Sequence, residues 1–109
     1  MNVQISESRG ELVAMLSGEI DHHTAREIRK EIDSEAERTH TPMLKLDFSS
    51  VQFMDSSGIG LIMGRFRLMQ LLGGSLLVVN VPPHLQRLIE ISGVGALGVL
   101  EFKRKGVLK

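Results

Sequence analysis

Apolar and polar side chains alternate along the first part of the chain. The alternation covers residues 3–8, a turn follows at Arg9 and Gly10, and an apolar run resumes over residues 11–17. Successive side chains of a β-strand point to opposite faces of a sheet, so a period of two indicates a strand with one buried face. The pattern therefore predicts a hairpin of two strands at the start of the chain.

Three later segments carry apolar residues three and four positions apart, the spacing that places side chains on one face of a helix. The second helix is expected to end near Gly73 and the third to begin at Pro82 and Pro83, because glycine commonly ends a helix and proline is tolerated at its start. The inward positions of the three helices are Ala25, Ile28, Ile32 and Ala36; Ile59, Ile62, Met63, Phe66 and Met69; and Leu85, Leu88 and Ile89.

The start of the first helix has two candidate caps. Asp21 offers a carboxylate to the free N–H groups of a first turn. Thr24 offers a hydroxyl, and Glu27 three residues later completes a capping box with it. Both alternatives remain open from the sequence.

Apolar segments at residues 43–48, 75–80 and 99–103 predict the remaining strands. The segment at 75–80 is continuously apolar, which is typical of a strand covered on both faces. Because strands and helices alternate after the hairpin, a largely parallel sheet packed with helices is favoured. We predict an α/β fold in which residues 1–109 form one compact domain.

Composition narrows the range of functions. The 109 residues are 42% hydrophobic, and thirteen basic residues balance thirteen acidic ones. A chain without net charge has no global field to draw it to nucleic acid or to an anionic membrane, so neither is expected as a partner. The absence of cysteine excludes disulfides and thiolate metal sites.

The sequence also carries no signal peptide that we recognise. Its most apolar segment, residues 71–81, is far shorter than the roughly 20 residues that a membrane-spanning helix needs. We therefore expect a soluble, cytoplasmic protein.

Glycines are dense at the start of the second predicted helix, in the stretch FMDSSGIGLIMGRF at residues 53–66. Each glycine inside a helix costs roughly 0.5 to 1 kcal/mol relative to alanine, so their presence requires a reason. Gly58 and Gly60 leave bare backbone in the first turn, which suits close approach of another group. Gly64, one turn further along, is expected to let the helix sit tightly on the sheet.

Three polar residues precede these glycines, at cap or first-turn positions where side-chain oxygens satisfy free N–H groups. They follow a predicted strand, and ligands of open α/β sheets bind outside the carboxyl ends of the strands. A well-capped helix accounts for the serines but not for the first two glycines. The candidate functional surface is Asp55, Ser56, Ser57, Gly58 and Gly60.

The stretch MDSSGIGLIMGR at residues 54–65 resembles the signature of the anti-sigma factor antagonists, the STAS-domain family. The earlier segment GEIDHHTA, residues 18–25, is similar to a second segment that is typical of the sporulation-type members. The predicted order of elements agrees with the family along nearly the whole chain. The likeness weakens after Gly93, where a closing helix common in the family is expected to be absent or very short.

The resemblance implies a STAS fold and a binding switch, with no catalytic residue and no cofactor of its own. In that family the second serine of the DSSG segment, here Ser57, is phosphorylated by the anti-sigma factor, a serine kinase that uses ATP and magnesium. A dedicated serine phosphatase removes the phosphate. The unphosphorylated antagonist, a monomer when free, captures the anti-sigma factor and so releases a sigma factor to activate transcription. Control of sigma F in sporulation is favoured, with a general stress-response pathway as the alternative.

The resemblance also implies a contact surface for the kinase around Ser57. Two alternatives stay open, since the earlier segment also reads as a helix cap with two solvated histidines, and Ser56 is the other possible phosphate acceptor. Adjacent histidines diverge on regular structure, so no metal site is expected. The residues expected to bind the partner are Asp21, His22, His23, Thr24, Asp55, Ser56, Gly58 and Gly60.

Two other functions compete with a switch. A serine hydrolase would use Ser57 as nucleophile with Asp55 and His22 or His23, but the G-x-S-x-G elbow is absent. A dinucleotide site would use the glycines at 58–64, but that motif should follow its strand immediately, and about ten residues separate Phe48 from Gly58. Neither pattern is as specific as the two family segments.

Overall fold

Strands and helices alternate in the predicted order through the part of the chain that the structure, a computed structural model, describes, which is residues 2–101. Each element follows from the local pattern of apolar residues. The elements are β1 (Val3–Ser8), β2 (Glu11–Ile20), α1 (His22–Thr39), β3 (Met43–Met54), α2 (Ser56–Leu71), β4 (Ser75–Val79), α3 (Pro83–Ser92) and the short 3₁₀ helix η1 (Val94–Leu97).

The four strands form one sheet in the order β1-β2-β3-β4. The hairpin pair β1 and β2 is antiparallel, with Val3 opposite Leu16. The pairs β2–β3 and β3–β4 are parallel, so a helix must cross over between the strands of each pair. The prediction of an α/β fold with a mixed, largely parallel sheet is confirmed.

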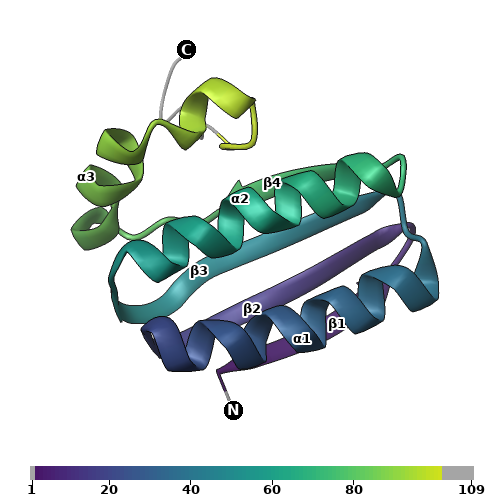
Figure 1. Ribbon diagram of the computed structural model, residues 1–109, viewed down its shortest axis with the longest axis horizontal. Coiled ribbons are helices and arrows are strands. Elements are labelled where there is room, and N and C mark those ends of the chain that lie inside the picture. The colour runs from purple at the N-terminus through teal and green to yellow at the C-terminus, as the bar shows by residue number, and fades with distance from the viewer. Residues whose placement is uncertain (1, 102–109) are drawn as a thin grey trace.

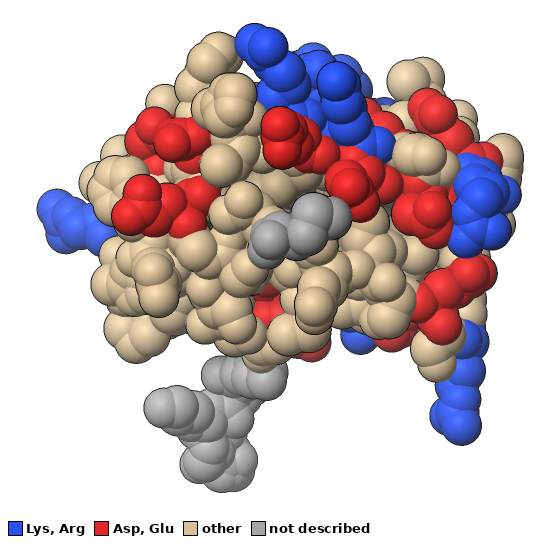
Figure 2. Space-filling model, turned by 90° about the horizontal axis from the view of Figure 1, so that it is seen from below, with Lys and Arg blue, Asp and Glu red and all other residues tan. Residues whose placement is uncertain are grey.

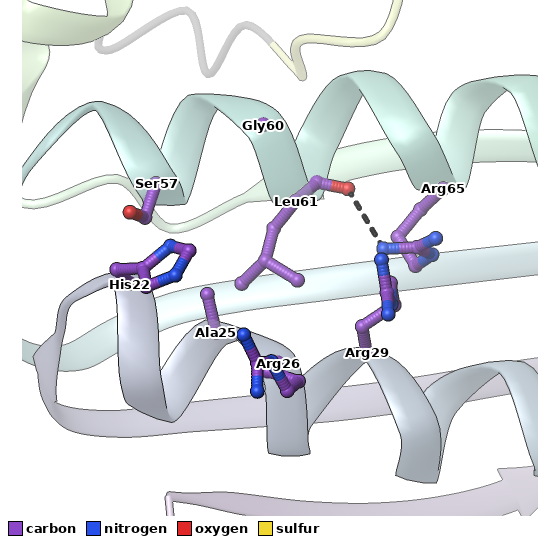
Figure 3. A pocket seen from close by; sticks show the side chains of 8 residues that line it. All are labelled: His22, Ala25, Arg26, Arg29, Ser57, Gly60, Leu61 and Arg65. Carbon is purple, nitrogen blue, oxygen red and sulfur yellow. Dashed lines mark hydrogen bonds between the residues drawn. The ribbon is translucent and has the colours of Figure 1, made fainter.

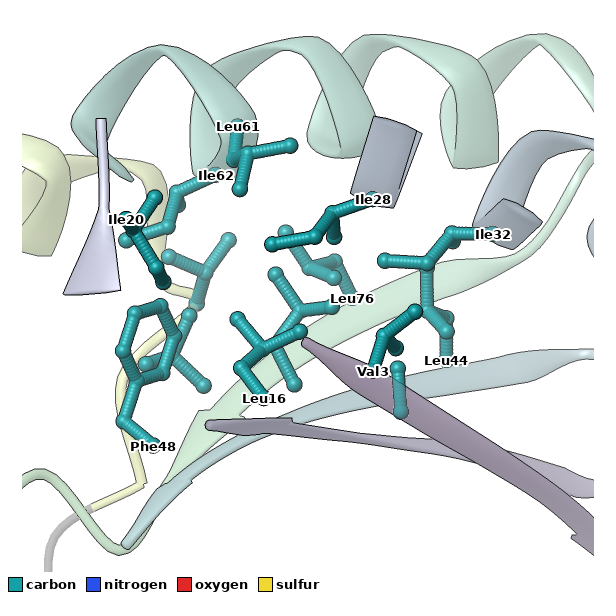
Figure 4. Packing of buried hydrophobic residues seen from close by; sticks show 14 of the residues in the cluster. Val3, Leu16, Ile20, Ile28, Ile32, Leu44, Phe48, Leu61, Ile62 and Leu76 are labelled. Carbon is teal, nitrogen blue, oxygen red and sulfur yellow. The ribbon is translucent and has the colours of Figure 1, made fainter. Parts of the chain in front are cut away.

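Helices α1 and α2 lie side by side on one face of the sheet, as Figure 1 shows. The side chains that point from the strands toward these helices are buried, among them Leu16, Leu44 and Phe48 (Figure 4). On the opposite face Met15 is 42% exposed. The prediction that the strand near residues 75–80 is covered on both faces is wrong for Leu77, which points to this second face and is only half-buried.

The buried side of α2 differs from the predicted stripe. Ile62 and Met69 are buried as expected, but Met63 is 43% exposed. Leu61 and Arg65 are buried instead. The physical reason is that α1 runs alongside α2, so the buried surface of α2 extends toward its neighbour as well as toward the sheet.

The segment after α3 is only partly as predicted. The glycine-rich residues after Gly93 form η1, and Leu100 then pairs with Val78 of β4 through a single parallel bridge. Residues 102 and 103, the end of the predicted last strand, lie outside the described residues. Within residues 2–101 no helix combines the length and the apolar character that crossing a membrane requires.

Candidate functional site

The two segments singled out in the sequence meet at one edge of the sheet. Ile20 at the end of β2 pairs with Met54 at the end of β3, and the backbone N–H of Asp55 donates to the carbonyl of Ile20 at 3.2 Å. Helix α1 therefore begins beside the start of α2. This edge holds the carboxyl ends of two neighbouring parallel strands, where ligands of α/β sheets commonly bind.

Asp21 caps α1. Its Oδ1 accepts hydrogen bonds from the backbone N–H groups of His23 and Thr24, both at 2.9 Å. The Thr24 hydroxyl accepts in return from the N–H of Asp21 at 2.9 Å. Asp21 and Thr24 thus form the capping box together, and the alternative box of Thr24 with Glu27 is wrong because the helix already starts at His22.

These hydrogen bonds, with the one from the Thr24 backbone first, hold the pKa of the Asp21 carboxyl below its ordinary 3.8. A carboxyl whose pKa is lower in the folded state stabilises the protein above the unfolded-state pKa, and that contribution is lost as the pH falls through the folded-state value. We expect Asp21→Asn to lower the urea midpoint near pH 7, since an amide accepts less strongly than a carboxylate. The difference from the wild type should shrink below about pH 4. A difference that stays constant from pH 3 to pH 7 would contradict this assignment.

Asp55 caps α2 in the same way. Its Oδ1 accepts from the backbone N–H of Ser57 at 2.8 Å, which leaves the Ser57 hydroxyl free of the cap. The two serines differ in their surroundings: Ser56 is exposed, whereas Ser57 is half-buried and lines a groove between α1 and α2. This difference in position, which the sequence does not show, favours Ser57 over Ser56 as the functional serine.

The groove runs between α1 and α2 and has a volume of about 380 Å³ (Figure 3). Ser57 and His22 face each other at one end of it, and Arg65 lies at the other. Sequence reasoning missed the arginines, although their spacing from His22 on α1 was a readable signal. The described residues that line the groove are His22, Ala25, Arg26, Arg29, Ser57, Gly60, Leu61 and Arg65.

The three glycines of α2 have different roles. Gly58 is buried, and a side-chain carbon there would collide with the side chain of Met54. It serves internal packing, so the expectation that it offers bare backbone to another molecule is wrong. Gly60 is exposed on the groove, with open space where a side chain would be. The expectation for Gly64 is wrong as well, because nothing lies within 4 Å of the position of its missing side chain.

Alanine substitutions separate these roles. We expect Gly58→Ala to lower the free energy of unfolding, because overpacking costs about 1 to 3 kcal/mol and the gain in helix propensity recovers only about 1 kcal/mol. Gly60→Ala should raise it by up to about 1 kcal/mol, since the added methyl group meets nothing. Urea denaturation measures both. Equal stabilisation by the two substitutions would show that Met54 does not restrict position 58.

An ion pair between buried Arg65 and half-buried Asp33 joins the two helices at the far end of the groove. Nε of Arg65 lies 2.8 Å from Oδ1 of Asp33, and a second guanidinium nitrogen donates to Oδ2 at 3.3 Å. Arg65 is only 5% exposed. Burial raises the pKa of Asp33 and lowers that of Arg65. The attraction between the two charges acts in the opposite direction on each pKa, but its effect is smaller than that of burial. The pair therefore fixes how α1 and α2 pack without providing a large net stabilisation.

The geometry of a hydrolase is not assembled among residues 2–101. Asp55 accepts from the backbone of Ser57, and no hydrogen bond joins the Ser57 hydroxyl to His22 or His23. A serine nucleophile needs an imidazole bonded to its hydroxyl and a carboxylate bonded to that imidazole. The same described residues contain no cluster of three or more histidine, aspartate or glutamate side chains placed to hold a metal.

Known proteins match this chain in both sequence and structure. The family model described as STAS domain matches residues 2–103. The chain is 42% identical over 96 residues to the anti-sigma F factor antagonist of Paenibacillus polymyxa, which covers 86% of this chain and 82% of that protein. It is 29% identical over 106 residues to the anti-sigma-B factor antagonist of Bacillus subtilis strain 168, covering 97% and 95%. The solved structure of the anti-sigma factor antagonist SpoIIAA in its unphosphorylated form superposes with a TM-score of 0.80 at 29% identity, covering 94% of this chain and 89% of that one.

Proposed function

Since this chain belongs to the STAS-domain family, we propose that it is an anti-sigma factor antagonist that binds the anti-sigma factor and loses this binding when Ser57 is phosphorylated. The observation that carries the proposal is the position of Ser57. Its backbone N–H is bonded to Asp55, while its side chain lies beside His22 at the end of a groove that begins at the start of α1. The regulatory binding role agrees with the names of the similar proteins, which are antagonists of anti-sigma factors.

The proposed cycle has two states. The unphosphorylated chain binds the anti-sigma factor, and a sigma factor is released to activate transcription. The anti-sigma factor, acting as a serine kinase, phosphorylates Ser57, and a serine phosphatase restores the hydroxyl. Sigma F is the favoured pathway, because identity to the sigma F relative is 42% and to the sigma-B relative 29%. Since sigma factors act on RNA polymerase, the proposed location is the cytoplasm.

Local physics explains why a phosphate changes binding and not the fold. A phosphoserine adds about −1.5 to −2 charges, and the first turn of a helix tolerates an anion because its N–H groups and dipole favour negative charge. The Asp55 cap uses the backbone of Ser57 and survives the modification. The new charge then acts on the partner, which meets Asp55, Ser56 and Gly60 on one helix and residues 21–24 on the other.

Phosphosite mapping tests the proposal. The purified chain is incubated with magnesium ATP and the candidate anti-sigma kinase of the same organism, and the products are analysed by mass spectrometry. We expect stoichiometric phosphate on Ser57, the same extent in Ser56→Ala, and none in Ser57→Ala. An unmodified chain, with the kinase active on another substrate, would overturn the proposed switch.

A further inference from the structure

The groove between α1 and α2 carries positive charge that Asp33, which pairs with Arg65 and also attracts Arg29, balances only in part. Its described lining contains three arginines and one histidine and no carboxylate. Arg65 is paired with Asp33, whereas Arg26 and Arg29 take part in none of the ion pairs of the described chain. Burial and then the like charge of Arg29 lower the pKa of Arg65, so the two cations repel each other. A groove of this kind favours an anion.

The basic side chains are arranged along one line. His22, Arg26 and Arg29 are four and three residues apart on α1, so they share one face of the helix. Figure 3 shows them on the α1 side of the groove, with Ser57 opposite His22. Figure 2 shows a group of Lys and Arg side chains at the upper edge of that view, with Asp and Glu side chains directly beside it.

Small residues keep the space between these groups open. Gly60 has nothing within 4 Å of its missing side chain, and Ala25 contributes only a methyl group from α1, while the Leu61 side chain points into the middle of the groove. Ser57 therefore lines a volume of about 380 Å³, large enough for a tetrahedral anion, whose lining also includes three guanidinium groups. Guanidinium binds phosphate oxygens with short, charge-assisted hydrogen bonds.

We propose that this groove holds the phosphoryl group of Ser57 within its own molecule, with His22 and Arg26 as its direct partners and Arg29 supplying further positive charge. The inference rests on the proposed phosphorylation of Ser57. Asp55 before α2 and Asp21 before α1 are negative groups that oppose it. Phosphorylation then changes the partner surface twice, because it adds a dianion and also engages His22 and Arg26, which are exposed in the unmodified chain.

The proton affinity of the phosphate tests this clamp. The chain is produced with phosphoserine encoded at position 57, so that no kinase is needed, and is titrated by phosphorus NMR. A nearby cation lowers the second pKa of a phosphate, which is about 6 without neighbours. We expect a proton affinity about three- to tenfold lower in the wild type than in Arg26→Gln or His22→Gln. Arg67→Gln, an exposed arginine of α2 outside the groove, is the matched control and should titrate like the wild type.

Two results would overturn the clamp. One is a phosphate that titrates alike in the wild type, in both groove variants and in the urea-unfolded chain. The other is a phosphate whose titration is the same in the groove variants as in the wild type, together with weaker binding of the unphosphorylated Arg26→Gln variant to the anti-sigma factor. That result would indicate that the groove binds an acidic group of the partner. Because the phosphate is encoded, either result is independent of kinase action. A failed phosphosite mapping would count against the switch alone.

Discussion

Ser57→Ala is expected to bind the anti-sigma factor whether or not kinase and ATP are present, while the phosphorylated wild type binds on the order of 100- to 1,000-fold more weakly. Mismatching a buried polar contact at an interface costs roughly 2 to 5 kcal/mol, and each 1.4 kcal/mol is about tenfold in affinity. Ser57→Asp should lose less, about 10- to 100-fold, because a carboxylate has less charge and bulk than a phosphate. Titration calorimetry with the purified anti-sigma factor measures all three affinities.

The neighbouring serine provides the matched control for this prediction. Ser56 is exposed and does not line the groove, so Ser56→Ala and Ser56→Asp should change the affinity much less than the same substitutions at Ser57. Equal affinities of Ser57→Ala and Ser57→Asp for the anti-sigma factor would contradict the proposed switch. A larger change in affinity on substitution of Ser56 would indicate that Ser56, not Ser57, is the functional serine.

The second large effect is expected at the ion pair that joins the two helices. Removing one partner of a buried pair costs roughly 3 to 5 kcal/mol, and we expect Arg65→Met to cost about 2 to 3 kcal/mol, because the side chain of Asp33 keeps 28% of its exposure to water. The double variant Asp33→Ala with Arg65→Met should recover most of this loss, since no unpaired charge remains. Urea denaturation of the wild type, Asp33→Ala, Arg65→Met and the double variant gives the coupling energy between the two side chains.

The dependence on pH provides an internal check on the ion-pair prediction. Burial raises the pKa of the Asp33 carboxyl in the folded protein, so the folded state takes up a proton more readily than the unfolded chain. The penalty for Arg65→Met is then largest at neutral pH and decreases as the pH falls and Asp33 is neutralised. Arg67→Met removes an exposed arginine of the same helix and should change stability little. A penalty at Arg65 no larger than at Arg67 would contradict a structural role for the pair.

The order of elements was readable from the sequence because each strand and helix carries its own apolar period. The apolar period predicts which face of an element is buried when the element packs against one neighbour. It predicts the wrong residues where a helix packs against two. Met63 fits the apolar stripe of α2 but is exposed, and Arg65 is buried because Asp33, 32 residues away in the chain, pairs with it. A pairing at such a distance leaves no local pattern.

In the candidate site, too, the sequence indicated the segments involved but not their individual contacts. The two family segments, residues 18–25 and 54–65, are far apart in the sequence, and strand pairing brings them together at Ile20 and Met54. Their individual contacts depend on three-dimensional packing. Gly58 was expected to face a partner but packs against Met54, and the groove that Ser57 shares with the α1 arginines requires knowing how far apart the two helices lie.

The Asp55 cap has a consequence for how long a signal lasts. Because its carboxylate accepts from the backbone of Ser57, the turn has the same support with a hydroxyl or a phosphoester on the side chain. No refolding step then stands between modification and response. Phosphate monoesters are among the slowest bonds to hydrolyse in water without an enzyme. In the proposed cycle the regulatory state is therefore held by a covalent bond, and the proposed phosphatase, not the stability of the fold, sets how long that state lasts.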